Sequence, residues 1–175
     1  MDERYRFEPL GERHLRLRAA FSCGEGALDR YLRERTRREV EQRVAAVRVL
    51  YDGEEDRLAG YYTLSAVAVE RTDVPSEITH RIVKYRVYPA TLIARLAVDQ
   101  RYQGERLGGW LLLDALARAL ATSRDVASVA VITDAKDEEA QSFYEHYGFQ
   151  RLSTERHSRR LFLPMGTVER LFTGR

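Results

Sequence analysis

The pattern of apolar and polar residues along the chain predicts strands interspersed with helices. Apolar residues three to four positions apart, typical of amphipathic helices, occur in residues 24–40, 110–120 and 137–147. Runs of mainly apolar residues, typical of strands, occur in residues 44–51, 58–67, 92–98, 128–132, 149–152 and 160–163. Asp52 and Gly53 form a turn that joins the first two strands into a hairpin. Residues 71–90 are expected to be a loop or a short helix ending at Pro89.

This order of elements predicts an α/β fold in which helices cover a sheet. The length of 175 residues and the hydrophobic content of 44% suit a single domain spanning residues 1–175. No apolar run is long enough to span a membrane, and the N-terminus lacks the apolar stretch of a signal peptide. Cys23 is the only cysteine, so an internal disulfide is impossible and a cytoplasmic location is expected. The formal net charge of +2 is too small to require a polyanionic partner.

The segment Gln103–Gly109 lies between a predicted buried strand and a predicted long helix, and it contains three glycines. Glycines let the backbone approach a diphosphate closely, and a helix N-terminus offers free N–H groups and a positive dipole end. The segment is therefore a candidate pyrophosphate cradle. An ordinary glycine-containing turn explains it equally well, because its spacing fits neither a P-loop nor a Rossmann fingerprint.

Two motifs carry a resemblance to a known family. The loop resembles the acyl-CoA motif of GNAT acetyltransferases, Gln/Arg-x-x-Gly-x-Gly/Ala, with Gln103 first and Gly108 last. Arg106 stands where the middle glycine of that motif is usual. Downstream, residues 143–149 resemble the GNAT signature Phe-Tyr-x-x-x-Gly-Phe. The resemblance implies the GNAT fold, in which helices flank a central, mostly antiparallel sheet that is splayed at the acetyl-CoA site.

The GNAT resemblance also implies which residues hold acetyl-CoA and which residue acts on it. In that family, strand backbone binds the pantetheine arm, the glycine loop binds the pyrophosphate, and a tyrosine protonates the departing thiolate. The tyrosine carried over is Tyr144. The implied cofactor residues are Leu96, Ala97, Val98, Gln103, Gly104, Glu105, Arg106, Leu107, Gly108, Gly109, Ala135 and Phe143.

A narrower resemblance covers nearly the whole chain. It is carried in order by Phe21–Gly24, Leu28–Leu32, Gly60–Ser65, Arg95–Asp99, Asp134–Ala135 and Arg160–Pro164. This set resembles the GNAT toxins of type II toxin–antitoxin systems. The resemblance implies acetylation of the α-amino group of aminoacyl-tRNA, which stops translation, and a small ribbon-helix-helix antitoxin as partner. A homodimer is compatible with it.

Acetyl transfer needs a neutral amine and a proton for the leaving thiolate. A free α-amino group has a pKa of about 7.7–8.0, and an adjacent ester lowers it further, so a strong general base is not required. A phenol is protonated at neutral pH and suits the general acid. Tyr144 is preferred over Tyr147 because the signature places it directly after Phe143. The alternative for Tyr144 is a ring packed in the core.

Residues 30–48 contain seven arginines against three glutamates, the strongest basic patch of the chain. Arg30, Arg33 and Arg37 fall near one face of the predicted helix, so they are candidates to contact tRNA phosphates. A solvated helix face with Arg–Glu pairs explains the pattern equally well.

Several alternatives remain at this point. A GNAT enzyme acting on a protein N-terminus, a polyamine or a drug is one, and a CoA-binding regulatory module that has lost catalysis is another. Cys23 lacks an activating pattern, so it is expected to be a small buried residue rather than a nucleophile. The four histidines have no metal-ligand spacing, so no metal site is expected.

Overall fold

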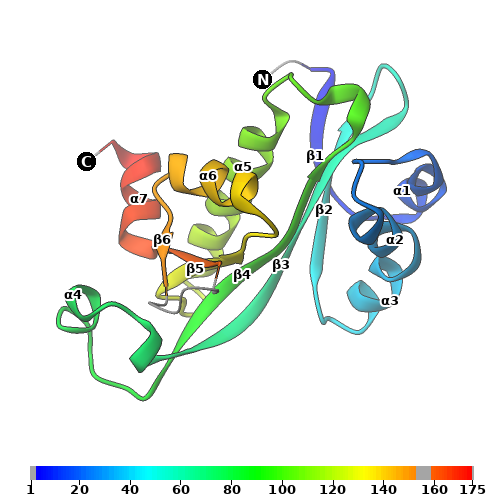
Figure 1. Cartoon of the computed structure of the whole chain (residues 1–175). Helices are drawn as coiled ribbons and strands as arrows, with labels where there is room; N and C mark the ends of the chain where they lie inside the picture. The colour runs from blue at the N-terminus through cyan, green and yellow to red at the C-terminus, as the bar shows by residue number, and fades with distance from the viewer. Residues whose placement is uncertain (1–2, 153–158, 175) are drawn as a thin grey trace. The chain divides into compact units, whose positions relative to one another are not determined.

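The computed structural model describes residues 3–152 and 159–174, which divide into two compact units. Unit 1 comprises Met1–Ser65 and Ala94–Ala115, and unit 2 comprises Ala66–Ile93 and Leu116–Arg175. The strand order is β1-β2-β3-β4-β5-β7-β6 (Figure 1). Strands β3 and β4 and helix α5 each contribute residues to both units. The mixed α/β class with a mostly antiparallel sheet is confirmed.

Unit 1 is an antiparallel meander with helices packed on it. Strand β1 pairs with β2, and β2 pairs with β3, both antiparallel. The elements that lie in unit 1 or begin there are β1 (Tyr5–Pro9), α1 (Glu12–Leu17), η1 (Arg18–Ala20), α2 (Gly26–Glu34), α3 (Thr36–Glu41), β2 (Ala46–Asp52), β3 (Arg57–Glu70), η3 (Gln100–Tyr102) and α5 (Leu107–Thr122). Strand β4 (Val87–Val98) enters unit 1 at Ala94.

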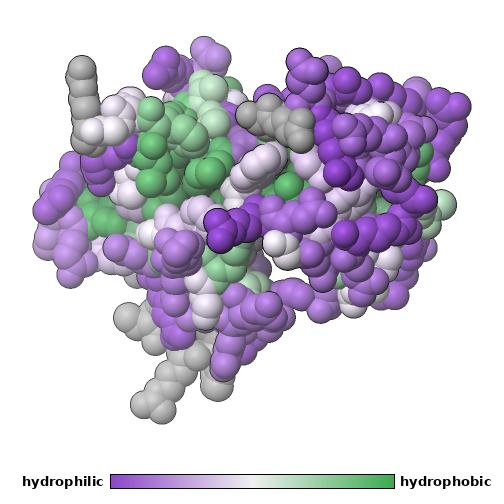
Figure 2. Space-filling view, turned by 90° about the horizontal axis from the view of Figure 1, so that it is seen from above, coloured by the Kyte–Doolittle hydropathy of each residue, from purple (hydrophilic) through white to green (hydrophobic). Residues whose placement is uncertain are grey.

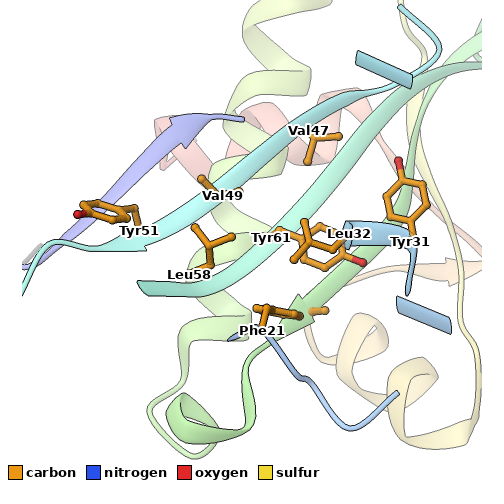
Figure 3. Packing of buried hydrophobic residues seen from close by; sticks show 9 residues of the cluster. Phe21, Tyr31, Leu32, Val47, Val49, Tyr51, Leu58 and Tyr61 are labelled. Atoms are coloured by element: carbon orange, nitrogen blue, oxygen red, sulfur yellow. The ribbon is translucent and has the colours of Figure 1, made fainter. Parts of the chain in front are cut away.

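The core of unit 1 lies between helix α2 and strands β2 and β3. Leu32 of α2 and Tyr61 of β3 are fully buried, and the ring of Phe21 meets that of Tyr61 edge-on at 5.6 Å (Figure 3). Tyr31, the residue before Leu32 in α2, stacks on Tyr61 with the ring centres 6.3 Å apart. Burial of this apolar face explains why the amphipathic segment forms a helix here, since short helices depend on tertiary packing.

Gly60 allows helix α5 to approach strand β3 closely. The register of the β2–β3 pair shifts beside it, between Leu50 and Tyr51. A Cβ atom at Gly60 would lie 2.7 Å from Leu111 Cδ1 and 2.9 Å from the backbone oxygen of Ala97. Both distances are shorter than a normal contact, so no larger residue fits without movement.

A buried carboxylate fixes the start of the chain to the hairpin. Asp52 is fully buried and accepts hydrogen bonds from the Arg4 guanidinium at 2.7 Å and from the Tyr102 hydroxyl at 2.8 Å. It also accepts bonds from the backbone N–H groups of Glu54 and Glu55. Burial by itself raises the pKa of Asp52, but these donors outweigh it and hold the pKa at about 2.

Unit 2 contains the parallel part of the sheet. Strand β4 pairs in parallel with β5, and β5 and β6 each pair antiparallel with β7. Its core joins Ile132 of β5 and Phe162 of β7 with Val69 and Ala90. The elements that lie wholly in unit 2 are η2 (Arg71–Asp73), α4 (Ser76–Thr79), β5 (Ala130–Asp134), α6 (Glu138–His146), β6 (Gln150–Arg151), β7 (Arg160–Pro164) and α7 (Met165–Thr173).

The helix predicted over residues 24–40 is wrong in one respect, because it breaks at Arg35. The Thr36 hydroxyl donates to the Leu32 carbonyl at 2.8 Å, and the Arg18 guanidinium donates to the same carbonyl at 3.1 Å. Both donors are side-chain groups, and they satisfy a backbone carbonyl near the end of α2. The helix therefore ends here, and α3 begins as a separate helix.

Other boundaries also differ from the prediction. Strand β4 starts at Val87, before Pro89, and helix α5 starts at Leu107 rather than Trp110. Strand β1 and helices α1 and α7 had not been predicted. For β1 the reason is that the strand is short and depends on pairing with β2. None of the helices in the described residues has the length and apolar character needed to cross a membrane.

Candidate active site

The glycine loop of unit 1 has the backbone expected of an anion cradle. Gly104 has a φ of +90° and Arg106 a φ of +62°, both in the left-handed region. Gly109 N–H donates to the Arg106 carbonyl at 3.1 Å. Within the described part of the chain, the N–H groups of Arg106, Leu107 and Gly108 have no backbone acceptor. Such free N–H groups at a helix start are the usual ligands of a phosphate.

The start of α5 at Leu107 corrects the predicted extent of the loop. Gly108 and Gly109 belong to the first helical turn, while residues 103–106 form the turn before it. Leu107 and Gly109 are buried and Gly108 is half-buried. The two glycines therefore bring the helix N-terminus itself, with its dipole, to the candidate phosphate position.

The side chains of the loop fix its position. The Gln103 amide donates to the backbone oxygens of Cys23 at 3.0 Å and Val98 at 3.1 Å. Glu105 accepts from the Tyr5 hydroxyl at 2.9 Å; burial and this bond raise the pKa of Tyr5 to about 12. Gln103 and Glu105 thus tie the loop to its surroundings.

The C-terminal half of β4 is the candidate pantetheine strand. The β4–β5 pairing runs over Thr91–Ile93 of β4 and ends at the pair Ile93–Thr133, although β4 continues to Val98. Leu96 and Val98 are half-buried, whereas Ala97 is buried in the core of unit 1. The Val98 carbonyl already accepts a hydrogen bond from the Gln103 side chain.

In unit 2, helix α6 positions Tyr144. The Asp137 side chain caps the helix by accepting from the Ala140 N–H at 2.8 Å, and Gly148 follows the helix with a φ of +91°. Tyr144 is buried, with its ring 5.2 Å from that of Phe143 and 5.4 Å from that of Phe149. Burial raises the pKa of Tyr144, so its phenol is protonated at neutral pH.

The hydroxyl of Tyr144 has one polar neighbour that sequence reasoning missed. Thr133, a buried residue of β5, lowers the pKa of Tyr144, although burial has the larger effect and raises it. The Thr133 hydroxyl in turn donates to the Ile93 carbonyl at 3.0 Å. A lone threonine in a buried strand was the available signal, because a buried hydroxyl must find a partner.

Three other predicted residues lie on or near α6. Phe143 is half-buried and contacts both Tyr144 and Tyr147 through its ring. Ala135 is buried directly after β5, and its N–H donates to the Arg159 carbonyl at 3.1 Å. Tyr147 is half-buried and lies at the C-cap of the helix.

The three arginines proposed for tRNA do not share one helix. Arg30 and Arg33 lie on α2 and Arg37 on α3, and all three are exposed. The side of the molecule on which α1, α2 and α3 lie is mainly hydrophilic in the view from above (Figure 2). Arg37 pairs with Glu41 at 2.9 Å, and Arg33 donates to the Phe21 carbonyl at 3.4 Å. Because the helix breaks at Arg35, Arg37 lies on a different helix from Arg30 and Arg33.

Arg30 instead joins a pocket of about 310 Å³ in unit 1. The Arg95 guanidinium lies 3.5 Å from the centre of the Tyr31 ring, a cation–π contact. The pocket is lined by Ala27, Leu28, Arg30, Tyr31, Glu34, Arg35 and Arg95. The prediction had missed Arg35 and Arg95 as members of this group. The sequence did contain a signal for Arg95, because it is the single charged residue in the apolar strand Leu92–Val98.

Cys23 and the histidines have no arrangement for catalysis. Burial raises the pKa of the Cys23 thiol to about 11, which disfavours the nucleophilic thiolate. His14 is buried and bonded to Glu8 at 2.9 Å, whereas His80 and His146 are exposed; His157 lies outside the described residues. Residues 3–152 and 159–174 contain no group of three or more potential metal ligands.

The acetyltransferase (GNAT) domain family matches residues 40–151, more than half of the chain. The chain belongs to the GNAT acetyltransferase family. The match includes the glycine loop, strand β5 and the whole of helix α6. This GNAT enzyme is therefore an N-acetyltransferase.

Individual relatives narrow the comparison. A tRNA-acetylating toxin of Mycobacterium tuberculosis is 32% identical over 136 residues, which cover 78% of this chain and 80% of the toxin. A structure of AtaT in complex with acetyl-methionyl-tRNAfMet has a TM-score of 0.86, 29% identity, and covers 97% and 99% of the two chains. A structure of an AtaT variant bound to acetyl-CoA and the C-terminus of the antitoxin AtaR has a TM-score of 0.81, 26% identity, and covers 98% and 99%.

Proposed function

We propose that this GNAT enzyme transfers the acetyl group of acetyl-CoA to the α-amino group of aminoacyl-tRNA and thereby blocks translation in the cytoplasm. The observation that carries the proposal is the likeness along nearly the whole chain to AtaT in its complex with acetyl-methionyl-tRNAfMet. The tRNA-acetylating toxin of Mycobacterium tuberculosis supports it from sequence. We further propose that both units act together as one acetyltransferase domain.

The residues of unit 1 fit acetyl-CoA. The free N–H groups of Arg106, Leu107 and Gly108 would hold its pyrophosphate, and the exposed Arg106 side chain adds a positive charge. Backbone groups of Leu96 and Ala97, beyond the last residue of β4 that pairs with β5, would bind the pantetheine arm as an added strand does. When bound, acetyl-CoA supplies an activated acetyl thioester.

The chain's own contribution to the reaction is a proton. The neutral amine attacks the acetyl carbon, the C–N bond forms, the C–S bond breaks, and the nitrogen loses a proton while the sulfur gains one. The pKa of an α-amino group is low enough that the neutral form is available without a strong base. Tyr144 donates the proton from its phenol oxygen to the departing sulfur, and burial keeps that phenol protonated beforehand.

The arginines of unit 1 are proposed to contact RNA phosphates. Arg30, Arg33 and Arg37 are all exposed, but Arg37 is already paired with Glu41. Arg30, Arg35 and Arg95 line one pocket together with Glu34, so three positive charges and one negative charge meet there. Neutralising Arg30 and Arg35 should weaken tRNA binding and flatten its salt dependence, whereas neutralising Arg37 should change little.

Incubation with labelled acetyl-CoA tests the proposed substrate. The acceptors compared are charged tRNA, uncharged tRNA, a peptide with a free N-terminus and a polyamine. Label should enter charged tRNA and be released with the amino acid when the ester is hydrolysed. Transfer to the peptide or the polyamine alone would replace the tRNA with a protein or small amine, and acetyl-CoA binding without any transfer would indicate a regulatory module.

Tyr144→Phe tests the proposed acid. The substitution removes only the hydroxyl, so acetyl-CoA binding should be retained and turnover should fall by roughly 10²–10⁴-fold, as for a positioned acid. Tyr147→Phe is the matched control on the same helix and should keep its turnover. Near-normal turnover of Tyr144→Phe, measured where chemistry limits the rate, would leave thiolate protonation to water or another group.

A protein partner must silence such an enzyme in its host. We propose a small ribbon-helix-helix antitoxin, in line with the AtaT structure that contains the antitoxin AtaR. Co-expression with the product of a neighbouring small reading frame should give a stable complex and restore growth. Normal growth on strong expression of the enzyme alone would count against toxicity. A homodimer is a separate proposal, tested by sedimentation.

A further inference from the structure

Glu105 puts a carboxylate directly before the N–H groups proposed to hold the pyrophosphate of acetyl-CoA. It is exposed, and the next residue is Arg106, the first of the three whose N–H groups have no backbone acceptor in the described part of the chain. A carboxylate is itself attracted by free N–H groups at the positive end of a helix. A free Glu105 side chain would therefore compete with the pyrophosphate for these groups and repel its charge.

The Tyr5 hydroxyl holds this carboxylate by donating a hydrogen bond of 2.9 Å to Oε2 of Glu105. Tyr5 is buried, and its ring packs edge-to-face with those of Tyr102 and Trp110, each at 6.3 Å. The Arg4 guanidinium lies 5.0 Å from the centre of the Tyr5 ring. Because these contacts fix the ring, the hydroxyl is a donor of fixed position for the exposed side chain of Glu105.

A second phenol fixes the turn that carries Glu105. The Tyr102 hydroxyl donates at 2.8 Å to the buried carboxylate of Asp52, which lies opposite Tyr5 in the β1–β2 pair. Glu105 N–H donates to the Tyr102 carbonyl at 3.3 Å, and Gly104 between them has a φ of +90°. The backbone of the turn is thus held through Tyr102. The bond from Tyr5 is left to decide where the Glu105 carboxylate points.

We propose that Tyr5 is a positioning residue for acetyl-CoA: its hydroxyl keeps the Glu105 carboxylate away from the N–H groups at the start of α5, so that the pyrophosphate meets no competing anion there. The inference rests on the proposed binding of the pyrophosphate at that helix start. Burial and the bond to Glu105 raise the pKa of Tyr5 to about 12, so the phenol remains a donor at neutral pH. In this role Tyr5 acts through Glu105 and takes no part in the chemical step.

Tyr5→Phe removes the hydroxyl and keeps the ring. Calorimetric titration with acetyl-CoA should give a Kd about 10-fold above that of the parent, the lower end of what a hydrogen bond to a charged group contributes. The KM for acetyl-CoA should rise by a similar factor while kcat stays unchanged. Tyr51→Phe is the matched control and should keep the parent Kd, because it removes a phenol bonded to Asp56 at 2.6 Å on strand β2.

Glu105→Asp breaks the same bond without disturbing the packing of Tyr5. Its shorter side chain cannot reach the Tyr5 hydroxyl, and position 105 is exposed, so the fold should be retained. Its Kd for acetyl-CoA should also rise about 10-fold. Thermal unfolding of each variant shows whether it is folded, and Glu105→Asp decides the question if Tyr5→Phe is not.

Removing the negative charge distinguishes positioning of the carboxylate from a structural effect of Tyr5. With Glu105→Gln in place there is no carboxylate to hold away, so Tyr5→Phe should change the Kd by less than about 2-fold. With Glu105 present, the ratio of the Tyr5→Phe and parent Kd values should shrink at about 1 M salt, where the Debye length is about 3 Å. Equal losses in both backgrounds, or an unchanged Kd of folded Tyr5→Phe, would overturn the role of Tyr5.

Gly108→Glu distinguishes a failure of this inference from a failure of the phosphate loop itself. If Gly108→Glu abolishes acetyl-CoA binding while folded Tyr5→Phe binds as the parent does, the loop holds the pyrophosphate without help from Tyr5. If Gly108→Glu binds acetyl-CoA with the parent Kd, the pyrophosphate lies elsewhere, and the role of Tyr5 is overturned together with that of the loop.

Discussion

Replacing Arg106 by glycine should stabilise the protein, because the position requires a left-handed backbone. Arg106 has a φ of +62° in the turn before helix α5. An L-residue with a side chain loses roughly 1–2 kcal/mol in this region, which glycine avoids. Glycine has more conformational freedom in the unfolded chain and gives back roughly 0.5–1 kcal/mol. The net gain expected for Arg106→Gly is therefore about 0.5–1 kcal/mol.

The gain is measurable by denaturant and thermal unfolding. For a chain of this length, about 1 kcal/mol corresponds to a rise of roughly 2–4 °C in Tm. Arg106→Ala is the first control, since it removes the side chain but keeps a Cβ and hence the strain. Arg43→Gly is the second, because Arg43 has a φ of +57° at the end of helix α3, and it should gain a similar amount.

The same variants separate the backbone of the loop from its charge. The Arg106 N–H is retained in both variants, so acetyl-CoA should still raise the Tm of each. Equal stabilities of Arg106→Gly and Arg106→Ala would refute the strain argument. They would show that the loop relaxes at no cost, and the glycine of the family motif would then need another explanation than backbone conformation.

Other residues give independent tests of the fold and the site. Asp52→Asn should lose about 2 kcal/mol of stability at neutral pH, because the pKa of Asp52 is about 2 in the fold against the ordinary 3.8, and this difference stabilises the fold above pH 4. In the parent protein this contribution disappears as the pH falls from about 4 to about 2. The stabilities of the parent and the variant should therefore converge in this pH range. Gly60→Ala should cost roughly 1–3 kcal/mol through its contacts with Leu111 and Ala97. A Cβ atom at Gly166 would lie 3.9 Å from Arg170 Nη1, an ordinary contact, so Gly166→Ala should cost nothing in a denaturant titration. Gly108→Glu should abolish the thermal shift given by acetyl-CoA, and a full shift would move the phosphate site elsewhere.

The sequence alone determined the elements whose signals are local. The run Leu92–Val98 predicts a strand, and the apolar spacing after it predicts the helix that became α5. Asp137 and Gly148 predict both ends of α6, because capping by a carboxylate and a left-handed glycine act within one helical turn. The two family motifs, which lie inside these elements, could be recognised in the same way.

Only the tertiary structure decided the features made by distant residues. The break at Arg35 depends on Arg18 reaching the Leu32 carbonyl from 14 residues away. The separation of Arg37 from Arg30 follows from that break, and the place of Arg95 beside Tyr31 follows from packing of β4 on α2.

The same distinction applies to the candidate active site. The signature identifies Tyr144, but Thr133, which lowers the pKa of Tyr144, lies on another element. The Ile93 carbonyl that accepts the hydrogen bond of the Thr133 hydroxyl lies 40 residues before Thr133 in the chain. Periodicity and motifs record the preferences of neighbouring residues. They do not record which buried hydroxyl or carbonyl will meet across the sheet, since that follows from strand order and register.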